Sequence, residues 1–466
     1  MLNIRLLFPV IIVLTLLGVP VQGQDDTDAR FLKEIHDQVL SEGECYNWLY
    51  HLSENIGGRL AGSPASDLAI QYTNKILSTI ADTVYLQECE VPYWERGKQE
   101  SVQIIYTDRK ALEIGGLALG NSVGSGPQGV TGKIIEVQSL DEVRSLGKEN
   151  IKGNIVFYNR PMDPTKIRTF HAYGGAGDQR VNGPAVAAEY GAIATVVRSV
   201  TLQLDDTPHT GVTIYKEGIP KIPAVAISTI DANHLSEMLA TDSGIQLRIE
   251  THSQVVEAAR TSYNVVAEIK GSTHPEEIIL VGGHLDSWDV GGGAHDDGAG
   301  CVHSMQVLAS LKALNYTPKR TIRCVLFMNE ENGLGGGLAY AKASNKANEY
   351  HMAAIESDAG GFSPNGFSCD GEEEVFANFY RQVTAWEPLL NPYMLQLNTG
   401  GSGADISPLK SQGGILVGLR PDSQRYFDYH HTAKDRIEAV HKRELELGAA
   451  AMTSLVYLLD KHGLKK

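Results

Sequence analysis

The last two-fifths of the chain alternate short apolar runs with amphipathic stretches. The runs are short enough for buried strands, and they occupy residues 263–269, 277–282, 321–328, 351–355 and 415–419. Apolar side chains at helical spacing predict a helix over 300–314, between the second and third runs. Strands that alternate with helices are typical of an open α/β sheet.

The middle of the chain has a different pattern. From Gly116 to Val256, short β-rich pieces are separated by Gly and Lys, with one helical stretch at 184–190. This predicts a β-rich domain of residues 116–256, inserted into an α/β domain made of residues 24–115 and 257–466. In the first part, Ser63 as a cap and Pro64 after it predict a helix over 63–79.

The first residues have the pattern of a signal peptide. Arg5 precedes an apolar run from Leu6 to Val19, and small residues follow at Val21 and Gly23. A membrane anchor is the alternative, but the run is about 14 residues and a spanning helix needs ~20. We therefore expect residues 1–23 to be removed, leaving a secreted, periplasmic or extracellular protein without stable membrane insertion.

Composition narrows the classes of partner. The formal net charge of −16 argues against binding to nucleic acid. The five cysteines are too few and too scattered for a disulfide scaffold, and buried thiols are expected at Cys301 and Cys324. A chain of 466 residues exceeds the usual size of one core, which agrees with two domains.

Histidines and acids gather in five loops of the predicted α/β domain. Three of these loops directly follow apolar strands, whose carboxyl ends form the edge where open α/β sheets bind ligands. In chain order the residues are His284 and Asp286, Asp296 and Asp297, Glu330 and Glu331, Asp358, and His430 and His431. Taken singly, each group is also what a surface turn or a helix cap would contain.

Taken together, these residues indicate a metal site. Adjacent buried carboxylates such as Glu330 and Glu331 repel each other unless a cation or a proton relieves them. Zinc accepts nitrogen and oxygen ligands, and paired metal ions need a bridging carboxylate. The inventory suffices for two Zn²⁺ ions per chain, with one carboxylate left as a general base.

The motifs HLDSWDVG, DDGAG, EENG, ESDAG, GADI and HH occur in this order. They resemble those of the co-catalytic di-zinc exopeptidases, the family of aminopeptidases and glutamate carboxypeptidases, and most of all its carboxypeptidase Q-like branch. The resemblance implies a mixed-sheet catalytic domain of α/β class with a protease-associated-like insert. It also implies a cis peptide bond between Asp296 and Asp297.

The resemblance further implies a role for each residue. One zinc would be held by His284 and Asp358, the other by Glu331 and His431, with Asp296 between them. Glu330 would take the proton of a water that bridges the metals. Asp286 would accept the proton of the second ring nitrogen of His284, and His430 would contact substrate.

The implied activity is hydrolysis of dipeptides or short peptides, with release of the residue that bears the free carboxylate. An aminopeptidase with the same metal site is the alternative. A catalytically inactive receptor is less favoured, because every ligand position is filled. A homodimer is left open. His295 is expected to be exposed rather than a third ligand, and Asp405 to cap a helix.

Overall fold

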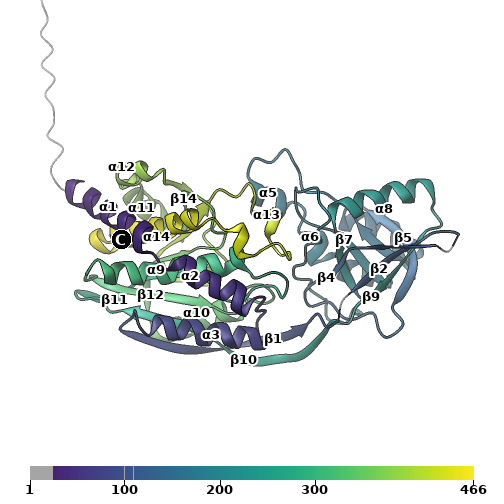
Figure 1. Ribbon diagram of the computed structural model, residues 1–466, viewed down its shortest axis with the longest axis horizontal. Helices are drawn as coiled ribbons and strands as arrows, with labels where there is room; N and C mark the ends of the chain where they lie inside the picture. The colour runs from purple at the N-terminus through teal and green to yellow at the C-terminus, as the bar shows by residue number, and fades with distance from the viewer. Residues whose placement is uncertain (1–24, 99, 109, 466) are drawn as a thin grey trace, which may run out of the picture.

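The protein consists of two lobes that lie end to end (Figure 1). The structure, a computed structural model, describes residues 25–465 except 99 and 109. Each lobe is built on an eight-stranded sheet. The predicted signal peptide lies outside the described residues. Within the described part of the chain, no helix combines the length and the apolar character needed to cross a membrane.

The larger lobe, which we call the main lobe, contains a mixed sheet. Its central strands β12, β11, β13 and β16 are parallel, while β10 and β14 run antiparallel on either side. The five strands predicted from apolar runs are confirmed, and β1, β14 and β15 are additions. In sheet order the strands are β1 (Thr83–Glu95), β10 (Gln254–Ile269), β12 (Arg320–Phe327), β11 (His274–His284), β13 (Tyr350–Glu356), β16 (Ile415–Pro421), β14 (Pro364–Gly371) and β15 (Gln396–Thr399).

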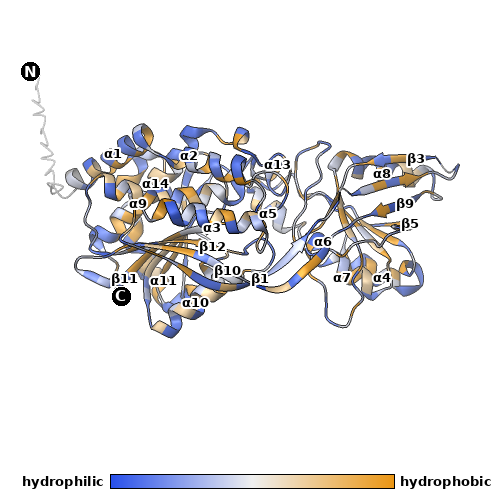
Figure 2. Cartoon of the chain, turned by 60° about the horizontal axis from the view of Figure 1, so that its bottom comes forward, coloured by the Kyte–Doolittle hydropathy of each residue, from blue (hydrophilic) through white to orange (hydrophobic). Residues whose placement is uncertain are grey.

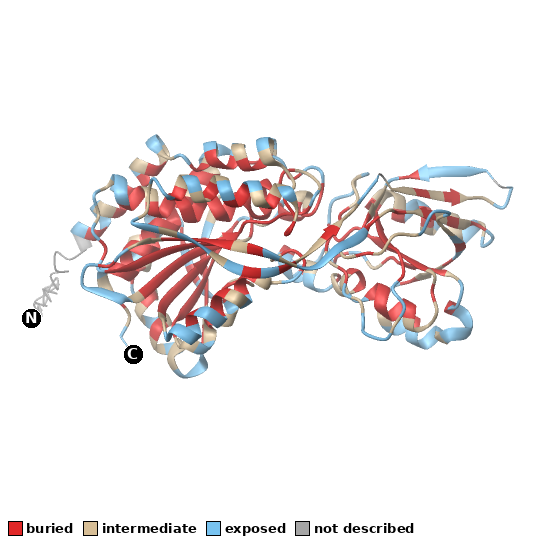
Figure 3. Ribbon diagram, turned by 90° about the horizontal axis from the view of Figure 1, so that it is seen from below, coloured by how far each residue is buried: buried red, intermediate tan, exposed pale blue. Residues whose placement is uncertain are grey.

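Helices bury both faces of this sheet. One face packs on the large core cluster that includes α9, α14 and the first three helices, and the other packs on α10. The buried strands and the half-exposed helices are visible in Figure 3, and Figure 2 shows the matching apolar faces. The helices of this lobe are α1 (Asp25–Glu42), α2 (Cys45–Tyr50), α3 (Pro64–Leu77), α9 (Ala299–Ala313), α10 (Gly335–Ala347), α11 (Glu373–Thr384), α12 (Glu387–Leu390), α13 (Tyr426–Tyr429) and α14 (Lys442–His462).

Two predicted helices begin where their sequence signals lie. The Ser63 hydroxyl accepts a hydrogen bond from the backbone N–H of Ser66, and Pro64 is the first residue of α3. The predicted helix at 300–314 is α9. All five cysteines are buried free thiols, which confirms the expectation for Cys301 and Cys324.

The smaller lobe, residues 96–253, lies between β1 and β10 in the sequence, and we call it the insert lobe. Its eight strands agree with the predicted β-rich character, and β5 to β8 are parallel neighbours with helices between β5 and β6 and between β6 and β7. The predicted insert of residues 116–256 covers six of the eight strands, and β2 and β3 precede it. In sheet order the strands are β3 (Ala111–Ile114), β2 (Ser101–Ile105), β9 (Gln246–Glu250), β5 (Val130–Val137), β6 (Ile155–Tyr158), β7 (Ala194–Arg198), β8 (Ala224–Ile227) and β4 (Gly116–Ala118).

A two-stranded ribbon joins the lobes. The antiparallel pair of β1 and β10 starts in the main sheet and runs on toward the insert lobe, where Glu95 pairs with Gln254 (Figure 1). The chain therefore leaves the main lobe and returns to it at one place, through β1 and β10. The helices of the insert lobe are α4 (Leu140–Ile151), α5 (Thr169–Gly174), α6 (Asp178–Val181), α7 (Gly183–Glu189) and α8 (Thr229–Thr241).

Candidate metal centre

The predicted site residues meet at the carboxyl edge of the parallel strands. His284 is the last residue of β11 and lies beside Phe327, the last residue of β12. Glu330 and Glu331 follow β12, and Asp358 follows β13 by two residues. Because these strands are parallel, their ends bring the three loops together at one edge.

The first group of possible metal ligands contains one imidazole and two carboxylates. The His284 Nε2 atom lies 3.2 Å from Asp296 Oδ1 and 3.7 Å from Asp358 Oδ1. One donor atom from each of these residues lies within 4.8 Å of the others, and His284 is almost fully buried. His284 Nδ1 faces the main-chain oxygen of Asp286 at 3.0 Å, which leaves Nε2 free to bind a cation.

A second group shares Asp296 with the first. The His431 Nε2 atom lies 3.2 Å from Asp296 Oδ2 and 3.1 Å from Glu331 Oε2. The two oxygens of the Asp296 carboxylate therefore face different groups, which is the geometry a bridging carboxylate requires. The peptide bond between Asp296 and Asp297 is cis, as the resemblance implied.

Either His430 or Glu331 could complete the second group of possible metal ligands. The ring of His430 stacks on that of His431 with centroids 3.4 Å apart, and its Nε2 atom lies 3.5 Å from Asp296 Oδ2. Asp296, His430 and His431 also offer donor atoms within 4.8 Å of one another. Glu331 places Oε2 3.1 Å from His431 Nε2, and it brings the negative charge that a cation requires.

The electrostatics of the cluster fit cations. Asp296 Oδ2 and Glu331 Oε1 are buried without a hydrogen-bond partner. Burial, followed by the charge of Asp296, raises the pKa of Glu331 to about 7. Burial would also raise the pKa of Asp296, but the nearby imidazoles of His284 and His431 outweigh it and hold that pKa well below its usual value. Carboxylates buried this closely repel one another, and bound cations would offset that cost.

Asp286 acts on the turn that carries the two glutamates. Its carboxylate accepts hydrogen bonds from the backbone N–H groups of Asn329 at 2.7 Å, Glu330 at 3.1 Å and Glu331 at 3.4 Å. The same carboxylate lies 3.8 Å from His284 Nδ1, whose closer partner is the main-chain oxygen of Asp286. Asp286 therefore contacts both His284 and the glutamate turn, and it fixes the turn with its side chain.

Two further acids hold the loop around Asp296. The Asp297 carboxylate accepts hydrogen bonds from the backbone N–H groups of His284 and Gly300, so both of its oxygens are occupied. The Asp435 carboxylate accepts from the backbone N–H groups of His295 at 2.7 Å and Asp296 at 3.1 Å. Of the adjacent pair, Asp296 is thus the residue left free to face the histidines.

Two expectations about neighbouring residues are wrong. His295 is fully buried, stacked on Phe362, with Nδ1 accepting from the Gly361 N–H and Nε2 donating to the Ala439 oxygen. Both ring nitrogens are therefore used, and His295 is neither exposed nor a ligand. Asp405 caps no helix, because its two carboxylate oxygens are buried without a partner. Burial, followed by the charge of Glu356, raises its pKa well above the usual value.

The insert lobe contributes main-chain atoms that the sequence did not reveal. The Thr210 N–H donates to the His431 oxygen at 3.0 Å, and the Thr210 oxygen faces His431 Nδ1 at 3.3 Å. This contact orients the ring so that Nε2 points to Asp296. Arg59 was also missed. It is fully buried and donates from its guanidinium to the main-chain oxygens of Leu285, Gly292 and Gly293, where an isolated Arg in an apolar, Gly-rich loop was the available signal.

A cleft of about 250 Å³ lies over the cluster, between the two lobes. Glu330, Glu331 and Asp358 line it from the main lobe, and Tyr173 and Arg180 line it from the insert lobe. Burial raises the pKa of Glu330 well above its usual value. Attraction to His284 opposes this effect, and repulsion from Asp358 adds to it. Glu330 thus faces the cleft as a carboxyl group whose surroundings favour its protonated form.

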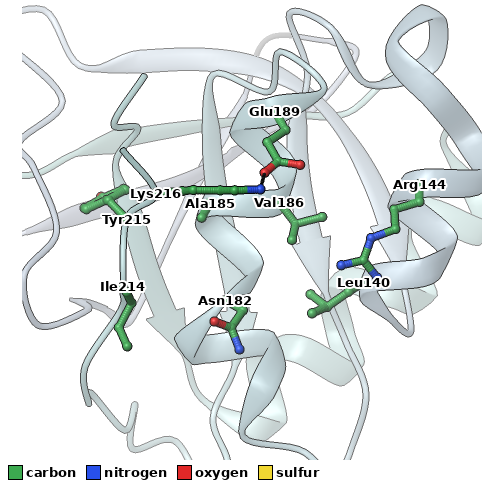
Figure 4. A pocket seen from close by; sticks show the side chains of 9 residues that line it. All are labelled: Leu140, Arg144, Asn182, Ala185, Val186, Glu189, Ile214, Tyr215 and Lys216. Atoms are coloured by element: carbon green, nitrogen blue, oxygen red, sulfur yellow. Dashed lines mark hydrogen bonds and ion pairs between the residues drawn. The ribbon is translucent and has the colours of Figure 1, made fainter. Parts of the chain in front are cut away.

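A separate cavity of about 370 Å³ lies within the insert lobe (Figure 4). Its charged side chains are already paired: Lys216 forms an ion pair with Glu189, and Arg144 donates to Asp141 at 2.6 Å. Leu140, Val186 and Ile214 supply apolar surface to it. The grouping of imidazoles with unpaired carboxylates belongs to the cleft and not to this cavity.

Known proteins resemble the chain in sequence and in fold. A sequence model described as peptidase family M28 matches residues 264–456. Carboxypeptidase Q of Homo sapiens is 33% identical over 420 residues, which is 90% of this chain and 86% of that protein. Carboxypeptidase Q of Xenopus laevis is 35% identical over the same shares of the two chains.

Two solved structures share the fold. The crystal structure of a peptidase M28 precursor from Shewanella amazonensis superposes with a TM-score of 0.88, at 31% identity, over 95% of this chain and 99% of that one. A zinc aminopeptidase from Bacillus subtilis has a TM-score of 0.63 at 19% identity, over 89% of this chain and 94% of that one, and shows likeness of fold alone. The chain belongs to peptidase family M28, among the relatives of carboxypeptidase Q.

Proposed function

We propose that this protein is a secreted, zinc-dependent exopeptidase that removes the carboxyl-terminal residue from dipeptides and short peptides. The observation that carries the proposal is the pair of ligand groups that share Asp296 below the cleft. Family membership supports peptide hydrolysis. The predicted signal peptide supports secretion.

Two Zn²⁺ ions fit the cluster, because its nitrogen and oxygen donors include buried oxygens without partners. His284 and Asp358 would hold one ion, Glu331 and His431 the other, and Asp296 both. When bound, zinc polarises a scissile carbonyl and lowers the pKa of a nearby water. We assign Glu331 rather than His430 to the second ion, which leaves the His430 ring beside it to contact substrate.

Glu330 is the proton carrier in this proposal. Its carboxyl group faces the cleft, and its backbone N–H is fixed by Asp286 at 3.1 Å. It accepts the proton of the attacking water as the new C–O bond forms, and it then delivers that proton to the nitrogen of the leaving residue as the C–N bond breaks. A bound cation would lower its raised pKa toward the range in which it can accept that proton.

Arg180 supports recognition of a free carboxyl terminus. Its side chain is 5% exposed, it lines the cleft, and its Nε atom has no partner. Its two hydrogen bonds go to the neutral oxygens of Tyr173 and Thr210. A substrate carboxylate on the Glu330 side of the cleft would give this buried cation a counter-ion.

The aminopeptidase alternative uses the same metal ligands, and blocked dipeptides separate the two activities. A carboxypeptidase cleaves an amino-terminally acetylated dipeptide and spares one with a carboxyl-terminal amide, while an aminopeptidase does the reverse. Arg180→Gln should raise KM for the acetylated substrate, and Arg144→Gln, in the separate cavity, serves as the matched control. Cleavage of the amide alone would replace our proposal with the aminopeptidase.

Metal analysis tests the less favoured inactive receptor. The purified mature chain should contain close to two zinc equivalents and should begin at Gln24 by mass spectrometry of its amino terminus. Protein that lacks zinc after saturation and hydrolyses neither blocked dipeptide would favour the receptor.

A further inference from the structure

A second cavity adjoins the metal centre at Asp358. Its volume is about 540 Å³, and Arg420, Phe367 and Asn398 are among its lining residues. We call it the Arg420 pocket. It shares Asp358 and Phe170 with the cleft, so the two spaces meet beside the first ligand group.

The side-chain hydrogen bonds of Arg420 go to neutral partners only. Arg420 lies near the end of β16, where Nε donates to the Ser368 hydroxyl at 2.7 Å and Nη2 donates to the Gly401 main-chain oxygen. These bonds fix the plane of the guanidinium while neutralising none of its charge. Burial lowers the pKa of Arg420 even against the opposing attraction of the nearby Asp358 and Glu356, as expected for a cation that is partly removed from water.

The charges of the residues that line the pocket favour an anionic ligand. Among the described lining residues, Asp358 is the single acid, and our proposed function assigns it to a metal. Arg168 is a second cation among the lining residues, and Asn365 and Asn398 supply amide groups. Phe170, which is 38% exposed, offers apolar surface against which a short aliphatic stem can pack.

The position of Glu330 indicates which part of a peptide substrate would lie in the cleft and which part would enter the Arg420 pocket. Glu330 lines the cleft but not the Arg420 pocket. Since Glu330 must reach the leaving nitrogen, the leaving residue lies in the cleft beside Arg180. The residue that supplies the scissile carbonyl then extends past Asp358 toward the pocket.

We propose that the Arg420 pocket receives the side chain of the residue on the acyl side of the scissile bond and selects a carboxylate there, as in glutamate or aspartate. This inference rests on the proposed function for the placement of the peptide. It does not depend on which terminus is read, because the acyl residue supplies the scissile carbonyl in either kind of exopeptidase.

Matched dipeptides test the selection. Substrates with Glu or Gln as the acyl residue and the same leaving residue differ by one charge and almost no volume. Wild-type kcat/KM should favour Glu by about 10- to 100-fold, the range of a hydrogen bond to a charged group. Arg420→Gln should abolish this ratio while leaving the Gln substrate near the wild-type rate, and Arg420→Lys should retain part of it. Arg144→Gln, in the separate cavity, should leave the ratio unchanged.

Two outcomes would overturn the inference. One is a wild-type enzyme that hydrolyses the Glu and Gln substrates equally well. The other is an Arg420→Gln variant that loses the same factor on both substrates, which would make Arg420 a support for the fold of the pocket.

A binding measurement separates this inference from the proposed function. Free glutamate and glutamine are the acyl-side products, and calorimetry should show tighter binding of glutamate to wild type than to Arg420→Gln. If neither dipeptide is hydrolysed and glutamate still binds through Arg420, the proposed function fails and the pocket stands. If the dipeptides are hydrolysed and glutamate binds both proteins alike, the pocket fails alone.

Discussion

The cleft at the metal centre and the cavity in the insert lobe differ in how their charges are partnered. The insert cavity is the larger, at about 370 Å³ against about 250 Å³. Its Lys216 and Arg144 are each paired with an acid. In the cleft, Glu331 and Asp296 each keep a buried oxygen without a hydrogen-bond partner, and Arg180 keeps a buried nitrogen without one.

This difference teaches that unsatisfied charge marks a ligand site better than size does. A buried charge without a partner is costly, so a fold retains a cluster of them where a ligand supplies the missing interactions. A paired charge at the surface contributes little and requires no ligand. The predictions below test whether the cleft residues behave as unsatisfied groups and the cavity residues as satisfied ones.

Removing metal should have the largest effect. Dialysis against a chelator should reduce dipeptide hydrolysis to the background rate, because Asp296 and its neighbours are left without the cations that their charges require. Two equivalents of Zn²⁺ per chain should restore it, as measured by a titration that follows rate against added metal. Full activity in chelated protein with no detectable metal would show that the charges in the cleft need no bound cation, and the cleft would then not differ from the insert cavity in this respect.

Substitution of the adjacent glutamates should separate their roles. Glu330→Gln keeps shape but cannot accept a proton, so kcat should fall by roughly 10²- to 10⁴-fold while zinc content stays near wild type. Glu331→Gln replaces an anionic ligand with a neutral amide, so zinc and activity should be lost together. Zinc analysis and turnover on both variants provide the check. Loss of zinc from Glu330→Gln alone would mean that the two roles are reversed.

Acidification should destabilise the main lobe, because its buried His351 makes both of its ring hydrogen bonds in the neutral form. His351 bonds to Tyr340 and Gln412, and burial is the main cause that lowers its pKa to about 4. The unfolded chain then takes up a proton first, so stability present above about pH 6.5 is lost as the pH falls toward 4. The loss should reach about 2–3 kcal/mol at pH 4.5.

Denaturant unfolding at pH 7 and pH 4.5, with chelator present in both, measures this loss. His351→Gln should show a smaller difference between the two pH values than wild type does. An equal difference in both proteins would show that His351 does not carry the effect.

The smallest effect is expected in the insert cavity. Lys216→Met removes a partly exposed ion pair with Glu189, so the free energy of unfolding should change by less than ~1 kcal/mol and kcat/KM should not change. Denaturant unfolding and dipeptide turnover are the measurements. A loss of activity comparable to that of Glu330→Gln would place a functional site in the cavity after all.

Much of the candidate site could be predicted because it obeys one rule of open α/β sheets. His284, Glu330, Glu331 and Asp358 follow parallel strands, and such strand ends meet at one edge. Thr210 could not be predicted in this way. It contacts His431 across 221 positions of sequence and through main-chain atoms, so its side chain carries no signal for the contact.

The errors in the fold have a similar physical origin. β1 contains Pro92 and many half-exposed polar residues, which suits an edge strand but produces no apolar run. The insert lobe starts with β2 and β3, two short strands that pair with each other and join the sheet where β2 pairs with β9. His295 was expected at the surface because its polar character gave no indication that Phe362 and two main-chain groups would surround it.

The ribbon of β1 and β10 bears on how such a molecule can arise. Because Glu95 and Gln254 face each other in register, the chain enters and leaves the insert lobe across a single rung of the ladder. A short hairpin turn could close that rung without moving any strand of the main sheet. An ancestor without the lobe would therefore already possess a complete sheet, and a gene segment could enter or leave at this turn in one recombination event. Selection would then act on how the new lobe meets the cleft, while the older sheet keeps its architecture.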